Sequence, residues 1–411
     1  MKISLKFAIP LIGAACLSPF VAWAVLSHAT TGDADGEAFE AAATEETVPE
    51  HAERSDEFGF AVSSIGFALG EDANAPIACP KGFSKGFIAA YEAAGGDIRL
   101  REGEAAQDYN VRMYAAASRS DAPGKGGVCL NPGARPDPFF RTVAPVDVIA
   151  EGVDLDGQAS RADGDPAPGT CAHDDFSSAS GARAIDNQMY RVLGCVTGYQ
   201  ETGASRDVSA SMLAGAWTIV INLTGVDSLE NDEDVEVGIY SSLDSLHVSP
   251  ARAPLEYASY TADEDPRFRA VARGRIVDGV LTTEPVDLKL RWAAEAWNLV
   301  RPLNHARLRL EISKDGASGL LSGYTPIDEW FANNYNYDAA KTPEGEPADA
   351  GYRWYSSIGT ANSQGFTCNG LYQAMHEAAD GDRDPETGAC ASLSTHYRIK
   401  AVPAFVMTNN N

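Results

Sequence analysis

The sequence has few basic residues. Its 411 residues include 32 lysines and arginines against 58 aspartates and glutamates, which gives a formal net charge of −26 at pH 7. A protein that neutralises nucleic-acid phosphates or adsorbs to anionic lipid needs a basic surface. The charge therefore argues against a nucleic-acid partner and against binding to an anionic membrane surface.

Common metal and haem motifs are also missing. No CxxC pair occurs, so zinc ribbons, thioredoxin-like chemistry and covalent c-type haem all lack their signature. His376-Glu377 begins like the HExxH motif of zinc proteases, but Asp380 stands where the second histidine is needed. We expect no haem, no zinc and no nucleotide cofactor.

The N-terminus carries an export signal. An apolar run at 7–26 follows two lysines, and Ala22-Trp23-Ala24 has the small-x-small pattern of a signal-peptidase site. The sequence therefore predicts a signal peptide at 1–24 and a periplasmic or extracellular protein. Two alternatives stay open: the run remains uncut as a membrane anchor, or Cys16 lies in a poor lipobox.

The cysteine count agrees with export. Setting Cys16 aside leaves six of the seven cysteines, and an even set in an exported chain predicts disulfides. Six cysteines allow 15 pairings. We predict the simplest of these, in which sequence neighbours pair: Cys79 with Cys129, Cys171 with Cys195, and Cys368 with Cys390.

Composition divides the remaining chain into three parts. Residues 25–58 are acidic and contain almost no large aliphatic side chains, which predicts a disordered linker. Residues 59–200 mix short helical patterns with loops and form the predicted disulfide-stapled N-terminal region. Residues 201–411 form a predicted β-sandwich with aromatic-rich loops, a C-terminal helix and a C-terminal strand.

Alternating apolar and polar residues support the β assignment. The pattern begins at Trp217 and returns at 288–292 and 308–312, and Asp278-Gly279 between apolar pairs is a strong hairpin signal. The predicted fold class is mainly β: an antiparallel, jelly-roll-like β-sandwich with a few short helices and disulfide-stapled loops.

Two acidic loops are candidate calcium sites. Calcium binds six to eight oxygen ligands on flexible backbone, and D-x-D spacing directs two carboxylates towards one point. The predicted metal ligands, for a structural calcium ion, are Asp154, Asp156, Asp163, Asp165, Asp382 and Asp384. An acidic surface turn without an ion remains the alternative for each loop.

A third polar stretch runs from Cys171 to Cys195. It contains His173, Asp174, Asp175 and Asp186, together with Asn187 and Gln188. Such a stretch fits a structural loop closed by a disulfide, a loop that binds a cation or ligand, or a catalytic loop. We favour the structural loop.

An aromatic tract near the C-terminus is a candidate binding surface. Flat rings interleaved with asparagine suit the faces of sugars, although a small core beneath a long loop is the alternative. The predicted ligand-binding residues are Trp330, Tyr335, Tyr337, Tyr352 and Trp354.

These features together suggest a non-catalytic exported binding protein, with a carbohydrate or a cell-envelope component as its ligand. A secreted carbohydrate-active hydrolase with paired carboxylates is the first alternative. A structural subunit of an envelope complex is the second.

Overall fold

The computed structural model describes most of the chain after residue 56. The described residues are 57–70, 77–119, 127–144, 148–181, 183–199, 210–215, 217–242, 244–294, 297–335 and 350–408. The predicted signal peptide and all but the last two residues of the predicted linker lie outside them.

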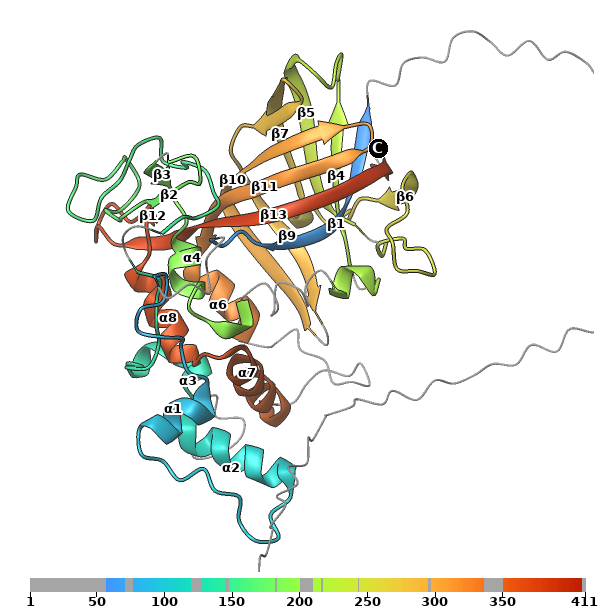
Figure 1. Ribbon diagram of the computed structural model, residues 1–411. Coiled ribbons are helices and arrows are strands. Elements are labelled where there is room, and N and C mark those ends of the chain that lie inside the picture. The colour runs from blue at the N-terminus through green and yellow to red at the C-terminus, as the bar shows by residue number, and fades with distance from the viewer. Residues whose placement is uncertain are drawn as a thin grey trace, which may run out of the picture. The chain divides into compact units, whose positions relative to one another are not determined.

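One large, mostly antiparallel sheet forms the body of the protein (Figure 1), so the prediction of a mainly β protein is confirmed. Eight of its eleven strands follow one another side by side: β1 (Phe58–Phe67), β4 (Ile219–Thr224), β5 (Asp232–Ser241), β7 (Arg269–Val277), β8 (Val280–Thr283), β10 (Trp297–Ser313), β11 (Gly316–Pro326) and β13 (Cys390–Met407). Because β1 pairs with both β4 and β13, the pairings return to their starting strand.

Three further strands attach to this sheet. Strand β12 (Gly381–Arg383) extends it beyond β13, β9 (Val286–Ala294) pairs with the first half of the long β10, and β6 (Ala258–Thr261) runs parallel to β13. A separate two-stranded sheet consists of β2 (Phe176–Ser177) and β3 (Arg183–Ile185).

The alternating pattern of the sequence explains the sheet core. Along β7 every second residue is buried, including Ala270, Ala272 and Ile276. Side chains on one face of a strand share one environment, so this alternation fills a continuous apolar core. The core also contains Trp217, and most of its other members come from β1, β4, β5 and the strands that follow.

The helices form a second apolar core. It joins parts of seven helices: α1 (Phe87–Ala93), α2 (Ala106–Ser118), α3 (Gly127–Leu130), α4 (Gln188–Leu193), α6 (Ile327–Tyr335), α7 (Ala350–Gln364) and α8 (Cys368–Glu377). Short 3-10 turns are η1 (Pro132–Ala134), η2 (Thr197–Tyr199) and η3 (Pro266–Phe268). Within the compact unit 54–411, helices α4, α6 and α8 contact β13.

The predicted boundary at residue 200 does not separate these two cores. Strand β1, from the predicted N-terminal region, lies in the large sheet. Helices α6 to α8, from the predicted sandwich region, pack against residues between 69 and 199. The chain crosses between the cores several times, so one sequence cut cannot divide them.

All six predicted cysteines are oxidised, but the predicted neighbour pairing is wrong. The disulfides join Cys79 to Cys195, Cys129 to Cys368 and Cys171 to Cys390. The reason is the shared helical core, which brings α8 onto α3 and the start of β13 onto the loop before β2. Three disulfides fit an exported protein. Among the described residues, no helix is both long and apolar enough to cross a membrane.

Candidate functional sites

Four aspartates and one histidine from distant parts of the chain meet beside β13. His173 Nε2 lies 2.9 Å from Asp186 Oδ1 and 3.2 Å from Asp175 Oδ1. Asp380 Oδ2 lies 3.8 Å from the same nitrogen. Ligand atoms of Asp156, His173 and Asp186 all lie within 4.8 Å of one another. We call these five residues the His173 cluster.

The backbone near one disulfide fixes the imidazole. His173 Nδ1 lies 2.8 Å from Cys171 O. A carbonyl oxygen only accepts hydrogen bonds, so Nδ1 carries a proton and Nε2 faces the carboxylates. Cys171 is bonded to Cys390, and its amide donates to Asp380 O at 2.9 Å. The disulfide therefore keeps the segments of His173 and Asp380 side by side.

Asp186 is held by the start of a helix. It follows β3 and precedes Asn187, which caps α4 and donates from its amide group to two backbone carbonyls. Asp186 Oδ2 accepts hydrogen bonds from Leu155 N at 2.5 Å and from Asp156 N at 3.2 Å. These two bonds direct the other oxygen of Asp186 towards His173.

Two buried carboxylate oxygens in the cluster lack hydrogen bonds. Asp175 accepts from Ser160 N through Oδ2, and Asp380 accepts from Ser394 N through Oδ1. Within the described part of the chain, Asp175 Oδ1 and Asp380 Oδ2 have no hydrogen-bond partner. A single N–H on His173 Nε2 cannot point at three oxygens at once. An unsatisfied buried charge is costly, on the order of a few kcal/mol.

Burial and mutual repulsion displace the pKa values of the cluster. Burial lowers the pKa of His173, but the nearby carboxylates of Asp175, Asp186 and Asp380 raise it to about 11 overall. Burial raises the pKa of Asp186 to about 7 and that of Asp380 to about 6. Among the described residues, no lysine or arginine forms an ion pair with the cluster, although the charge of Arg191 interacts with Asp175 over a longer distance.

A second buried histidine adjoins the cluster. His396 Nε2 donates to Asp186 O, and its Nδ1 accepts from Ser322 Oγ at 2.6 Å. Burial lowers the pKa of His396 to about 4, so this ring is neutral at pH 7. Both ring nitrogens are engaged, and His396 therefore supports the backbone of Asp186 from outside the cluster.

The first predicted calcium loop contributes one residue to the cluster. Asp156 lies there, whereas Asp154 accepts a hydrogen bond from a backbone amide of its own turn at 2.6 Å. Asp163 forms an exposed pair with Arg161, and Asp165 is exposed. These four predicted ligands do not converge on one point.

The second predicted calcium loop also does not converge. Asp382 Oδ2 accepts from Asn304 Nδ2 at 2.8 Å. Asp384 Oδ1 accepts from the backbone amides of the turn that follows it. Asp380, at the start of the same loop, is the residue that enters the His173 cluster. Asp380 stands two residues before Asp382 in the sequence, but no local sequence signal brings it to His173.

One of the five aromatic residues predicted to bind a ligand is not on the surface. Trp330 is fully buried in the helical core, with Arg301 Cζ 5.1 Å from its ring centroid. A ring without exposed surface offers no face to a sugar, so the prediction for Trp330 is wrong. The side chains of Tyr335, Tyr352 and Trp354, and the whole of Tyr337, lie outside the described residues.

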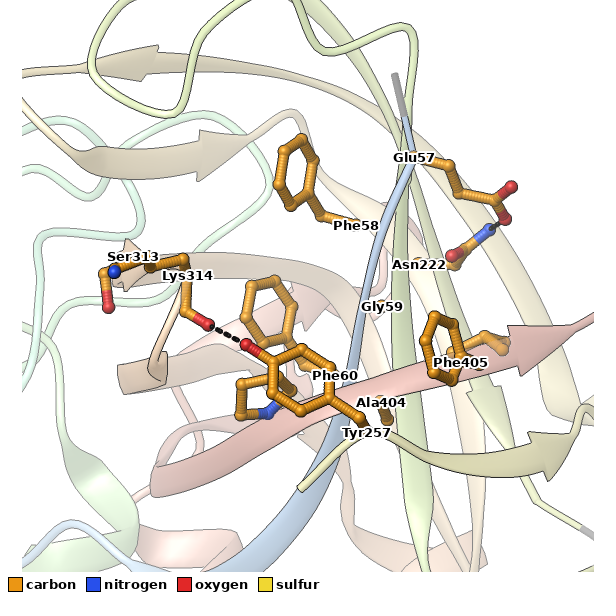
Figure 2. Close-up of a pocket in the computed structure, with 12 residues that line it drawn as sticks. Glu57, Phe58, Gly59, Phe60, Asn222, Tyr257, Ser313, Lys314, Ala404 and Phe405 are labelled. Carbon is orange, nitrogen blue, oxygen red and sulfur yellow. Dashed lines mark hydrogen bonds between the residues drawn. The ribbon is translucent and has the colours of Figure 1, made fainter. Parts of the chain in front are cut away.

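A different aromatic surface lies at the sheet, around a groove of about 330 Å³. Tyr257 and Phe405 are 54% and 59% exposed, and their ring centroids are 6.2 Å apart. Figure 2 shows these rings with Phe58 around the groove, which is formed by the start of β1, the end of β13 and the β10–β11 turn.

Polar groups stand at both ends of this groove. At one end, Asn222 Nδ2 donates to Glu57 Oε1 at 2.8 Å, while the buried Asn222 Oδ1 has no hydrogen-bond partner among the described residues. At the other end, Tyr257 donates its hydroxyl to Lys314 O at 3.2 Å (Figure 2). Tyr257 has φ +56°, a left-handed conformation that costs a bulky residue energy.

The chain matches no protein-family model, no curated protein and no solved structure. The function of the protein is therefore inferred from its own residues.

Proposed function

We propose that this is an exported, non-catalytic binding protein and that a neutral carbohydrate binds in the groove beside Tyr257 and Phe405. The observation that carries the proposal is a pair of exposed aromatic rings, Tyr257 and Phe405, that line one groove with the carboxylate of Glu57. Sugars present C–H faces that stack on aromatic rings, and hydroxyl groups that donate to a carboxylate.

The choice of a neutral ligand follows from charge. The chain has a net charge of −26, and Glu57 lies at the rim of the groove. Polyanionic envelope polymers would be repelled by this field. Neutral hydroxyl groups bind to a carboxylate such as that of Glu57 without that repulsion.

A hydrolase is less well supported by the same geometry. Glycosidases use two carboxylates about 5–10 Å apart on either side of the bond they cleave. The lining of the groove contains one acid, Glu57. The aspartates of the His173 cluster lie close together, but Asp186 and Asp380 are fully buried and His173 nearly so. A substrate cannot reach them there. The groove is therefore better explained as a binding site than as a catalytic site, in the periplasmic or extracellular location that the export signal predicts.

Glycan-array screening of the secreted protein, followed by calorimetry with the best neutral oligosaccharide, tests the proposal. We expect Tyr257→Ala and Phe405→Ala each to weaken binding about tenfold or more, because each removes a stacking face. Phe83→Ala is the matched control, since Phe83 is 37% exposed and lies outside the groove.

Two results would overturn the proposal. One is that no neutral glycan binds. The other is self-association of the wild-type protein that Tyr257→Ala and Phe405→Ala abolish, because the same apolar surface would then be a protein interface, as in a structural subunit.

A further inference from the structure

The His173 cluster has the properties of a closed metal site. We propose that Asp156, His173 and Asp186, whose ligand atoms lie within 4.8 Å of one another, bind one divalent transition-metal ion of the Mn²⁺ or Zn²⁺ class, and that Asp175 and Asp380 move in to complete its ligand set. The site is separate from the groove and goes beyond the proposed binding function. Its role would be to lock the helical core and its loops to β13.

Ligand spacing is the first support. Ligand atoms about 2.1 Å from a metal lie about 3.0 Å apart along an octahedral edge and about 3.4 Å apart along a tetrahedral edge. The distances from His173 Nε2 to the nearest oxygens of Asp186 and Asp175, 2.9 Å and 3.2 Å, lie close to these values. Asp175 and Asp380 lie outside the set of ligand atoms within 4.8 Å of one another, so their side chains must shift to reach an ion bound by Asp156, His173 and Asp186.

The orientation of the imidazole is the second support. Histidines that bind metals usually donate their other ring N–H to a carbonyl or carboxylate, which fixes the tautomer. His173 does this through Nδ1 and Cys171 O, at 2.8 Å. The nitrogen left over, Nε2, points into the carboxylates.

The unsatisfied oxygens are the third and independent support. Asp380 Oδ2 and Asp175 Oδ1 both face Nε2, and both are buried without a hydrogen-bond partner in the described residues. An acidic turn stabilised by its own backbone would not leave such atoms. A dication at this point would coordinate both oxygens and neutralise negative charge that one imidazolium cannot balance.

The donor set selects the class of ion. Calcium and magnesium prefer oxygen ligands alone, whereas an imidazole beside carboxylates suits manganese, iron and zinc. We therefore still propose a structural metal ion, but a transition-metal ion in place of the calcium ion expected from the sequence. This proposal also replaces the expectation that zinc would be absent.

The mature protein, stripped with a chelator and dialysed, should be titrated calorimetrically with Mn²⁺, Zn²⁺ and Ca²⁺ in turn. We expect about one equivalent of Mn²⁺ or Zn²⁺ to bind, with Ca²⁺ weaker. At a hundredfold excess of free ion over the dissociation constant, the native state gains about 2.7 kcal/mol, so the melting temperature should rise. The electron paramagnetic resonance spectrum of bound Mn²⁺ reports binding without any variant.

Variants then locate the site. Asp175→Asn and Asp380→Asn keep side-chain size and should each weaken metal binding at least tenfold. Asp384→Asn is the matched control, because Asp384 is exposed on the same acidic loop as Asp380 and lies outside the cluster. Circular dichroism checks that each variant is folded; if Asp380→Asn does not fold, Asp175→Asn and the wild-type spectrum still decide.

Three results would overturn the proposal. The first is that the stripped wild-type protein takes up neither Mn²⁺ nor Zn²⁺, which would leave the cluster as a buried ion network. The second is that Ca²⁺ binds more tightly than both of these ions. The third is that Asp384→Asn weakens metal binding as much as Asp175→Asn, which would place the ion in the exposed turn.

Discussion

At the scale of single residues, His396 should make stability depend on pH. Its pKa is lowered from 6.5 to about 4 by burial. Below pH 6.5 the unfolded chain therefore takes up a proton that the folded chain refuses. The stability that the neutral, buried His396 ring contributes is complete above pH 6.5. It declines as the pH falls towards 4 and is absent below that pH. The full loss is about 3 kcal/mol.

The variant His396→Gln isolates this effect, because glutamine donates and accepts hydrogen bonds but does not titrate. Urea unfolding should be measured at pH 7 and pH 4.5, with chelator present so that metal plays no part. We expect the wild type to lose about 2 kcal/mol more than the variant between these two pH values. Equal losses in the two proteins would mean that His396 is not the titrating group.

The residues of the His173 cluster show how far sequence reasoning reaches. His173, Asp175 and Asp186 stand in one polar stretch, so their types and spacing marked that stretch as a candidate cation loop. Asp380 belongs to another loop far along the chain, and only the Cys171–Cys390 disulfide and the β13 pairing bring it close. Periodicity and motif spacing report local contacts, so they did not predict this meeting or the disulfide pairing.

At the scale of elements, the β7–β8 hairpin should depend on one glycine. Asp278 and Gly279 have φ values of +49° and +76°, as expected for the tight turn that their sequence predicts. A Cβ on Gly279 would meet nothing closer than Ile312 O at 3.8 Å, so an added methyl group fits in the available space. The cost of Gly279→Ala is therefore conformational, and we expect stability to fall by about 1 kcal/mol.

Urea unfolding of Gly279→Ala against wild type measures this cost. Asp278→Gly is the control. Glycine tolerates the same φ, so this substitution should leave the free energy of unfolding nearly unchanged. If Gly279→Ala were as stable as wild type, the turn would adopt another conformation in solution.

The elements also differ in how well the sequence predicted them. In β7 the alternation of the sequence matches the alternation of burial, whereas β4 alternates in sequence but is buried at five of its six residues. Helix α1 begins at Phe87 after Gly86, without a side-chain cap, although Ser84 nearby is a residue type that favours helix starts. Ser84 is buried and its hydroxyl group accepts a hydrogen bond from Arg141 N at 2.9 Å and donates to Arg141 O at 3.1 Å. The Ser84 side chain therefore makes a tertiary contact with Arg141 instead of capping the helix.

At the scale of the whole molecule, the disulfides stabilise one of the two cores. Four of the six paired cysteines belong to the helical core, and the other two lie in a loop beside it and at the first residue of β13. The sheet core contains none. The bonds join residues 116, 219 and 239 positions apart. In the chain-entropy account, closing each such long loop is worth about 5 kcal/mol.

Reduction should therefore loosen the helical core before the sheet. Hydrogen–deuterium exchange of the native and reduced protein, read by mass spectrometry, compares the two regions in one experiment. We expect faster exchange in α1, α4 and α8, and little change in β4, β5 and β7, whose apolar core has no cysteine to lose. The double variant Cys129→Ser/Cys368→Ser sharpens the test, because it should affect α3 and α8 more than α4. Equal acceleration in helices and strands would show that the two cores unfold as one unit, so that the Cys79–Cys195 bond supports β4 as much as α4.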